Sequence, residues 1–126
     1  MRGIRALIVD DDPISAKLLA LILSGEGCDV RVASEAEEAL RIAATFVPRV
    51  IVVDLMLPGM SGAVLTELFR VNPLTRSATI LIVTAFDGLA TERLALAAGG
   101  DAYVRKPIDA LAFPSLLRGL LASKGE

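Results

Sequence analysis

Hydrophobic residues gather in two kinds of segment that alternate five times along the chain. Short runs rich in aliphatic and β-branched residues cover positions 4–10, 28–33, 49–54, 79–84 and 102–106, and such runs predict strands. The longer stretches between them place apolar residues three and four positions apart, which predicts helices. Five strand–helix units in succession predict an α/β protein, in which helices cover both faces of a parallel sheet.

Apolar stripes and chain breakers refine this prediction. Three of the predicted helices carry a stripe, at Ile14, Leu18, Leu21 and Ile22, at Ala36, Ala39, Leu40 and Ala43, and at Val64, Leu65 and Leu68. Glycine and proline mark the ends of the segments, at Gly25, Gly27, Pro48, Pro73, Gly99 and Gly100. The runs 49–54 and 79–84 are almost continuously aliphatic, which is typical of strands buried on both faces.

The last predicted helix contains a proline where its second turn would lie if it began directly after Pro107. Proline has no N–H group and clashes inside a helix, but it fits at or before the third helical position. We therefore predict that the regular helix starts near Ala112, after a looser turn, or that it is kinked at Pro114. Its apolar stripe is expected to face the sheet and consists of Phe113, Leu116, Leu117, Leu120 and Leu121.

Composition and charge narrow the class of protein. The 126 residues, 54% of them hydrophobic, suit a single domain over 1–126 with a substantial core. A net charge of −2 gives no reason to expect contact with nucleic acid. The apolar runs are far shorter than the ~20 residues that span a bilayer, so we expect a cytoplasmic protein without membrane contact. Cys28 is the only cysteine and histidine is absent, which argues against disulfides, zinc sites and histidine-based catalysis.

Polar residues with useful chemistry lie where four of the five predicted strands end. Asp10 and Asp11 end the first strand, Asp54 the third, Thr84 the fourth and Lys106 the fifth. In parallel α/β sheets, ligands bind beyond the carboxyl ends of the strands. Only the end of the second strand lacks a group suited to phosphate or metal, so the other four ends are the candidate site.

Each of these residues also has an ordinary structural explanation. An aspartate before a helix is usually a cap, and a threonine at a strand end is common. A Lys-Pro pair most often forms an exposed turn, and Asp54 before LMLPG could simply begin a loop. A tyrosine in a strand, such as Tyr103, usually packs against its neighbours. Taken singly, none of them identifies a function.

The set is more informative than its members. Asp10, Asp11 and Asp54 would converge on one concave edge, and clustered carboxylates suit Mg²⁺, which keeps several waters and shares phosphate oxygens. A cation would also relieve the repulsion among the acids. With a positive charge from Lys106 and a hydroxyl from Thr84, the edge suits phosphoryl transfer. A carboxylate nucleophile would give an aspartyl-phosphate.

Five short segments in order resemble the receiver domain of two-component response regulators, over about residues 4–122. They are VDDDP at 9–13, DLMLPGMSG at 54–62, VTA at 83–85, AGGDAYV at 98–104 and KP at 106–107. The spacing matches as well, because Thr84 lies 30 residues after Asp54 and Lys106 lies 22 residues after Thr84. The resemblance implies the flavodoxin-like receiver fold, a five-stranded parallel sheet with strand order 2-1-3-4-5.

The resemblance implies a role for each residue of the acidic site. Asp54 would be the phosphoacceptor, taking a phosphoryl group from a phosphohistidine. Asp11 would be a direct Mg²⁺ ligand, with Asp10 as its mostly water-mediated companion, and the metal would also bind Asp54 and the backbone carbonyl of Met56. The third acid of the run, Asp12, precedes a proline, and we interpret it as the cap of the first helix.

The remaining site residues would transmit the signal. Lys106 would neutralise the phosphoryl charge, and its bond to Pro107 is expected to be cis. Thr84 would hydrogen-bond a phosphoryl oxygen and Tyr103 would follow it inward. The small Ala85 leaves a path to Asp54. The domain would catalyse only its own phosphorylation and dephosphorylation.

The implied partners are a sensor histidine kinase or a histidine phosphotransfer protein. In addition, an effector or a second copy would bind the side formed by the helix after residue 84, the strand 102–106 and the last helix. Two other functions remain open from the residues. One is an aspartyl phosphatase, although Met56 stands where such enzymes carry a second aspartate. The other is a constitutive binding module with a vestigial site, against which the complete set of site residues argues.

Overall fold

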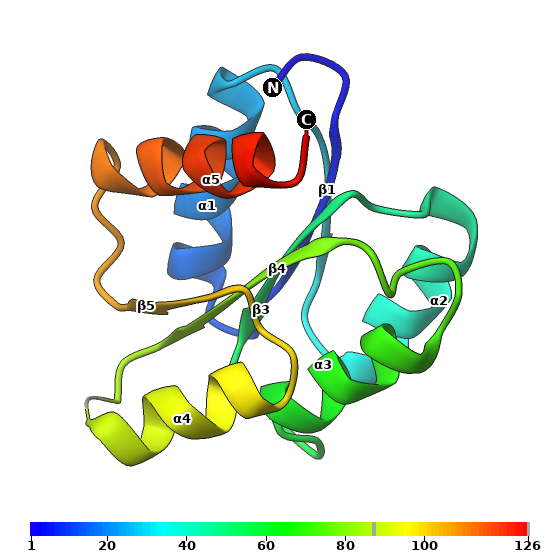
Figure 1. The fold of residues 1–126 in the computed structure, drawn as a ribbon, viewed down its shortest axis with the longest axis vertical. Coiled ribbons are helices and arrows are strands. Elements are labelled where there is room, and N and C mark those ends of the chain that lie inside the picture. Colours follow the sequence, from blue (N-terminus) through cyan, green and yellow to red (C-terminus); the bar gives the residue numbers. More distant parts are fainter. Residues whose placement is uncertain (87, 126) are drawn as a thin grey trace.

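The five predicted strands form one parallel sheet. The computed structural model describes residues 1–86 and 88–125 (Figure 1). The strands are β1 Arg5–Val9, β2 Asp29–Ala33, β3 Val50–Asp54, β4 Thr79–Thr84 and β5 Ala102–Arg105. The helices are α1 Pro13–Gly25, α2 Ala36–Phe46, α3 Gly62–Val71, α4 Leu89–Ala97 and α5 Ala112–Ser123. The strand order is β2-β1-β3-β4-β5, so the predicted fold class and topology are confirmed.

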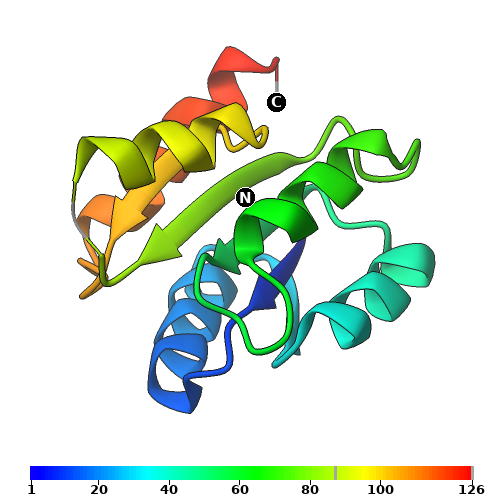
Figure 2. The ribbon, with the colours of Figure 1, turned by 90° about the horizontal axis from the view of Figure 1, so that it is seen from below.

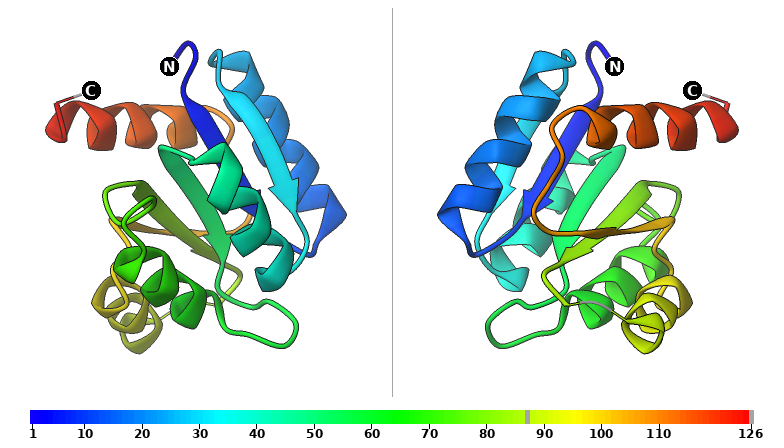
Figure 3. Two further views of the ribbon diagram at one scale, coloured as in Figure 1. Left: turned by 90° about the vertical axis from the view of Figure 1, so that its right-hand side faces the viewer. Right: turned by 90° about the vertical axis from the view of Figure 1, so that its left-hand side faces the viewer.

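The sheet separates two helical layers, with α1 and α5 on one face and α2, α3 and α4 on the other (Figures 1 and 3). Side chains of a strand alternate between its two faces. In β1, Leu7 and Val9 belong to the core beneath α2–α4, whereas Ala6 and Ile8 belong to the core beneath α1 and α5. Strands β3 and β4 are buried along their whole length, as the aliphatic runs predicted.

The parallel pairing brings all five carboxyl ends to one edge of the sheet (Figure 2). We call this the carboxyl edge, and the opposite one the amino edge. Among the described residues, no helix has both the length and the apolar character needed to cross a membrane.

Helix α1 forms as predicted but buries a different face from its predicted stripe. Ala16, Leu19 and Leu23 are buried against the sheet, whereas Ile14 is 80% exposed and Leu21 is 63% exposed. The stretch is apolar on nearly every side, so its periodicity does not identify the face that meets the sheet. The outer face of α1 is therefore unusually apolar.

The stripes of α2 and α3 had different outcomes. In α2 the buried residues are Ala36, Ala39 and Ala43, which confirms the prediction. In α3 only Leu65 of the stripe is buried, and Phe69, which was not part of the stripe, is buried as well. Val64 and Leu68 lie on the solvent side of α3, so that part of the expected stripe was wrong.

Helix α5 starts at Ala112, which places Pro114 at its third position. Ahead of it, Asp109 Oδ1 accepts hydrogen bonds from the N–H groups of Leu111 and Ala112, at 2.9 and 3.0 Å. The proline thus occupies a position where no intrahelical N–H bond is lost. Both the late start and the turn before it are confirmed.

The apolar stripe of α5 faces the sheet in part. Phe113, Leu117 and Leu121 are buried, while Leu116 is 39% exposed. Residues four apart lie on one side of a helix, and Leu116 is displaced from that line by one position. The expectation that Leu116 faces the sheet was therefore wrong.

Candidate functional site

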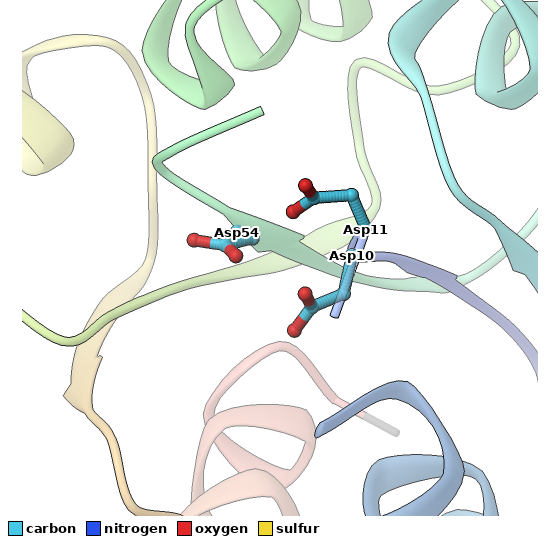
Figure 4. Close-up of side chains that lie close together, drawn as sticks. All are labelled: Asp10, Asp11 and Asp54. Atoms are coloured by element: carbon cyan, nitrogen blue, oxygen red, sulfur yellow. The ribbon is translucent and has the colours of Figure 1, made fainter. Parts of the chain in front are cut away.

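The three acids of the predicted site lie together at the carboxyl edge, as Figure 4 shows. One carboxylate oxygen from each of Asp10, Asp11 and Asp54 lies within 4.8 Å of the other two. Asp10 and Asp54 follow or end the buried strands β1 and β3 and are 2% and 5% exposed, whereas Asp11 is exposed. The convergence expected from the parallel sheet is therefore present.

The ends of β1, β3 and β4 share one local device. A side-chain oxygen at each strand end accepts a hydrogen bond from the backbone N–H two residues later. The bonded pairs are Asp10 Oδ1 with Asp12 at 2.9 Å, Asp54 Oδ1 with Met56 at 3.0 Å, and Thr84 Oγ1 with Phe86 at 3.1 Å. Aspartate and threonine form such turns readily. Each turn fixes the direction of a site side chain without using a second side chain.

Lys106 connects two of the acids from the end of β5. Its bond to Pro107 is cis, as expected. Its Nζ lies 3.0 Å from Asp54 Oδ2 and 3.0 Å from Asp10 Oδ2. Only the contact with Asp54 has hydrogen-bond geometry, and the buried Asp10 Oδ2 has no hydrogen-bond partner. One ammonium group thus faces two carboxylates and satisfies one of them.

Burial and neighbouring charges shift the pKa values of both Asp10 and Lys106. Burial raises the pKa of Asp10, and the charge of Asp54 adds to the rise, against the opposing effects of the Asp12 N–H group and Lys106. Burial alone would lower the pKa of Lys106, but its close contacts with the Asp10 and Asp54 carboxylates raise it overall. The Asp10 shift thus comes mainly from burial, and the Lys106 shift comes from the two carboxylates beside it.

The residues of the site fit a magnesium ion. Three carboxylates supply the oxygen ligands that Mg²⁺ prefers. Asp10 Oδ2, which pairs with Lys106 but accepts no hydrogen bond, is a buried acceptor that a cation or its water would satisfy. Met56 directly follows this site in the chain and its N–H already binds Asp54. Its carbonyl as a further ligand remains a prediction.

Thr84 and Tyr103 meet at one segment of backbone. Thr84 is buried at the end of β4, and Tyr103 lies half-buried on β5 against the core beneath α2–α4. The Tyr103 hydroxyl donates to the carbonyl of Phe86, whose N–H donates to Thr84. Sequence reasoning paired the two residues but missed this link, because a backbone group has no signature in the sequence.

Asp12 is a helix cap, as interpreted from the sequence. Its Oδ1 accepts from the N–H of Ile14 at 3.1 Å and its Oδ2 accepts from the Ser15 hydroxyl at 2.9 Å. These two hydrogen bonds lower the pKa of Asp12, and the one from Ser15 has the larger effect. Of the three consecutive aspartates, Asp10 and Asp11 therefore belong to the acidic site, and Asp12 caps helix α1.

Gly62 is a site-forming residue that sequence reasoning missed. A Cβ atom at this position would lie 2.2 Å from the backbone carbonyl oxygen of Asp54, so only glycine allows α3 to begin this close to the strand. The residue belongs to the DLMLPGMSG segment, which was the available signal. Close packing here holds the backbone of Asp54 against the start of α3.

Comparison with known proteins decides the family. Residues 6–118 match the model of the response regulator receiver domain. The chain belongs to this family. Receiver domains are signalling modules of two-component systems and not classical enzymes, so the phosphatase and the vestigial binding module are not favoured.

Individual proteins similar to this receiver domain support the assignment. The probable transcriptional regulatory protein TcrX of Mycobacterium tuberculosis is 37% identical over 97% of this chain and 51% of its own length. The response regulator PleD of Caulobacter vibrioides is 32% identical over 95% of this chain and 26% of its own. The chain therefore spans about half, or less, of these relatives.

A solved structure gives the same result for the fold. A putative response regulator from Chloroflexus aurantiacus superposes with a TM-score of 0.90 at 34% identity, covering 96% of this chain and 99% of its own. Receiver domains generally bind Mg²⁺ at an acidic pocket, and this domain has a cluster of three carboxylates at its carboxyl edge.

Proposed function

We propose that this domain is a phosphorylation-driven switch in which Asp54 accepts the phosphoryl group. The observation that carries the proposal is that one Lys106 ammonium pairs with both Asp10 and Asp54, while the buried Asp10 Oδ2 accepts no hydrogen bond. An acidic pocket with more negative than positive charge favours the binding of a cation, and a lysine beside Asp54 favours the binding of an anionic phosphoryl group. The two features together suit phosphoryl transfer to a carboxylate.

The donor in this proposal is a phosphohistidine on a sensor kinase or a phosphotransfer protein. Asp54 Oδ2, beside Lys106, attacks phosphorus, the P–N bond breaks, and the imidazole leaves with the bonding electron pair. Meanwhile the Met56 N–H group keeps Asp54 Oδ1 in place. Bound Mg²⁺, held by Asp10, Asp11, Asp54 and the Met56 carbonyl, supplies charge neutralisation for the phosphoryl oxygens. Water later hydrolyses the acyl phosphate on the same site.

The switch itself runs through the segment that follows β4. Thr84 turns its hydroxyl towards the phosphoryl oxygens, which gives up the hydrogen bond from Phe86. Because Tyr103 donates to the carbonyl of Phe86, a shift of this segment also moves Tyr103 inward. The side formed by α4, β5 and α5 then differs between the two states.

We place the output contact on this side of the domain, with an effector or a second copy as partner. The solvent side of α5 offers small residues, and at Gly119 an added Cβ would meet no atom within 4 Å. Its one charged residue, Arg118, already pairs with Glu26. Contact here would therefore depend on close packing more than on salt bridges.

Labelling with acetyl phosphate tests the function directly. Intact-mass spectrometry of the wild-type domain is expected to show one added phosphoryl group with Mg²⁺ and none without it. Asp54→Ala should abolish the label, while Asp12→Ala, which removes a helix cap and not a site oxygen, should keep it. Equal labelling of wild type and Asp54→Ala would sink the assignment. Sustained turnover of phosphate esters would favour a phosphatase instead.

A further inference from the structure

The sulfur atoms of the chain differ in their exposure to solvent. The chain has three methionines and one cysteine. Cys28 is buried, and burial raises the pKa of its thiol, so little of the reactive thiolate is present at neutral pH. Met1 and Met60 are half-buried and pack against the two cores, whereas Met56 is 56% exposed. Met56 is therefore the sulfur most open to an oxidant in solution.

Met56 also stands next to the phosphoryl-transfer site. Its N–H group donates to Asp54 Oδ1 at 3.0 Å, and its carbonyl is the further magnesium ligand of the function proposed above. The residues on either side of it, Leu55 and Leu57, are buried, so the loop is anchored around an exposed side chain. A chemical change in that side chain therefore acts on a residue whose backbone orients the phosphoacceptor.

The Met56 side chain lies in a largely apolar groove of about 380 Å³ between the loop 55–61 and helix α4. Leu57, Met60 and, from α4, Leu94 line the groove with it. The hydroxyl oxygen of Ser61, which also lines it, already accepts the N–H group that it caps at the start of α3. Such surroundings suit a thioether, and they offer few hydrogen-bond donors to a strongly polar group.

Oxidation by a hydroperoxide or a hypohalous acid would change the polarity of this side chain. With hydrogen peroxide, a lone pair of the Met56 sulfur attacks one peroxide oxygen, the O–O bond breaks and an S–O bond forms. Proton transfer releases the second oxygen as water, so that sulfur loses two electrons and the peroxide gains them. The product is a sulfoxide, which is polar and carries a strong acceptor oxygen.

The sulfoxide does not suit the groove. A polar oxygen among Leu57, Met60 and Leu94 would lack hydrogen-bond partners, which costs free energy. We expect the oxidised side chain to leave the groove for water and to displace the backbone of Met56. Because that backbone fixes Asp54 Oδ1, the phosphoacceptor would then be held less well for transfer, and small displacements of a reacting group slow a reaction.

We propose that Met56 is a site of reversible oxidation, and that its sulfoxide lowers the phosphorylation of Asp54. The oxidant is a hydroperoxide or a hypohalous acid. The reverse step is reduction by a methionine sulfoxide reductase, in which two thiols form a disulfide and the sulfoxide oxygen leaves as water. This inference rests on the proposed function, because it requires Asp54 to accept a phosphoryl group.

Graded oxidation of the purified domain tests the proposal. After brief treatment with hydrogen peroxide, peptide mass spectrometry should find sulfoxide at Met56 ahead of Met1 and Met60. Once catalase has removed the peroxide, the domain oxidised at Met56 should take label from acetyl phosphate and Mg²⁺ about three- to tenfold more slowly than untreated domain. Methionine sulfoxide reductase with a thiol should restore the rate.

Three variants separate Met56 from the other sulfurs. Leucine has nearly the volume of methionine and no oxidisable atom, and each leucine variant is compared with its own untreated rate. Peroxide should leave Met56→Leu unchanged, whereas Met60→Leu, the matched control in the same groove, should slow as much as wild type. Untreated Met56→Gln, which places a polar amide in the groove, should label more slowly than untreated Met56→Leu.

The outcomes are distinguishable. The proposal is overturned if another methionine oxidises ahead of Met56, if Met56 sulfoxide leaves labelling unchanged, or if peroxide slows Met56→Leu as strongly as wild type. The last result would place the sensitive atom elsewhere, for example at Cys28. An untreated wild type that takes no label contradicts the proposed function itself, whereas label that is indifferent to Met56 sulfoxide contradicts only this inference.

Discussion

The two edges of the sheet each hold a cluster of partly buried charges, and the clusters differ in how well they are satisfied. At the amino edge, Asp101 Oδ2 accepts from Arg70 at 2.9 Å, from Lys124 at 3.0 Å and from the N–H group of Ile80 at 2.9 Å. One acid here faces two bases. At the carboxyl edge the ratio is reversed, since the two acids Asp10 and Asp54 share Lys106.

The cluster at the amino edge serves to hold segments together. Arg70 also donates to the carbonyls of Gly99, Arg76 and Ala78, at 2.8, 2.9 and 2.6 Å. These bonds join α3, the turn before β4, the turn before β5 and, through Lys124, the end of α5. Gly99 lies so near that an added Cβ would be 2.7 Å from Arg70 Cγ. Fully paired charges of this kind stabilise the fold and leave nothing for a ligand.

At the carboxyl edge the charges are not fully paired in this way. Asp10 Oδ2 is buried without a hydrogen bond, and burial with repulsion raises the pKa of this carboxyl group. A native fold keeps an arrangement of this kind where function requires it. The comparison teaches that a buried ion cluster by itself does not mark a site, whereas unbalanced charge and an unsatisfied oxygen do.

The largest expected effect is on transfer at the carboxyl edge. Lys106→Ala removes the only ammonium group beside Asp54 among the described residues, so acetyl phosphate labelling should slow roughly 10²–10³-fold, the usual cost of losing one charge-stabilising donor. Lys124→Ala, the matched change at the amino edge, should label at the wild-type rate. Stopped-time mass spectrometry measures both. Similar slowing in the two variants would break the contrast between the edges.

A smaller effect is expected on stability at the amino edge. Asp101→Ala leaves Arg70 and Lys124 without their carboxylate. The three side chains of this cluster are only about one-fifth to one-third exposed. Loss of these charged hydrogen bonds should lower the free energy of unfolding by about 2–3 kcal/mol. Urea unfolding followed by circular dichroism gives the value, and acetyl phosphate labelling of the folded variant should be normal. A stability loss below 0.5 kcal/mol, on the order of a surface change, would contradict the assignment.

At the carboxyl edge, removal of an aspartate charge should raise the stability of the fold instead of lowering it. Asp10→Asn removes a charge that the fold disfavours, so without Mg²⁺ the variant should melt a few degrees above wild type. Because the folded-state pKa of Asp10 is raised, wild-type stability falls as pH rises through that pKa. The advantage of the variant should therefore be present at neutral pH and vanish below the unfolded-state value of 3.8.

Magnesium should reverse this order, because ligand binding stabilises the state that binds it. The wild type should gain more in melting temperature from millimolar MgCl₂ than Asp10→Asn does. Differential scanning fluorimetry across pH and Mg²⁺ concentration measures both effects. A wild type that is more stable than the variant without metal at pH 7 would argue against excess charge at the site.

The smallest effect concerns an acid near the carboxyl edge that is satisfied. Asp109 accepts hydrogen bonds from two backbone N–H groups before α5. Both bonds lower its pKa, the one from Ala112 more than the one from Leu111. Stability from such a group is present above its unfolded pKa and lost as pH falls through the folded one. Asp109→Ala should slightly lower the melting temperature at pH 7 and have no effect at low pH, opposite in sign to Asp10→Asn.

Much of the site was predictable because a parallel sheet has simple geometry. Alternating strand and helix patterns imply that strand ends meet at one edge, so Asp10, Asp54 and Thr84 were expected near one another. The cap at Asp12 and the late start of α5 followed from proline chemistry, which acts over a few residues. Local rules of this kind depend on neighbours in the chain and need no tertiary contact.

The contacts that distinguish the two edges were not predictable in the same way. Arg70 and Asp101 are 31 residues apart, and Lys124 is a further 23 away. Nothing in their local sequence separates this closed cluster from the open one around Lys106. The choice of face on α1 likewise depended on which sides the sheet covers.

The sequence by itself determined the order of strands and helices, the family resemblance, and which polar residues stand at the strand ends. Those features follow from periodicity and from short-range backbone preferences, which each segment carries within itself. Only the tertiary structure decided that Lys106 hydrogen-bonds Asp54 and leaves Asp10 Oδ2 without a hydrogen bond. Such balances arise when distant segments pack, because burial and the direction of each side chain set the strength of a charge interaction.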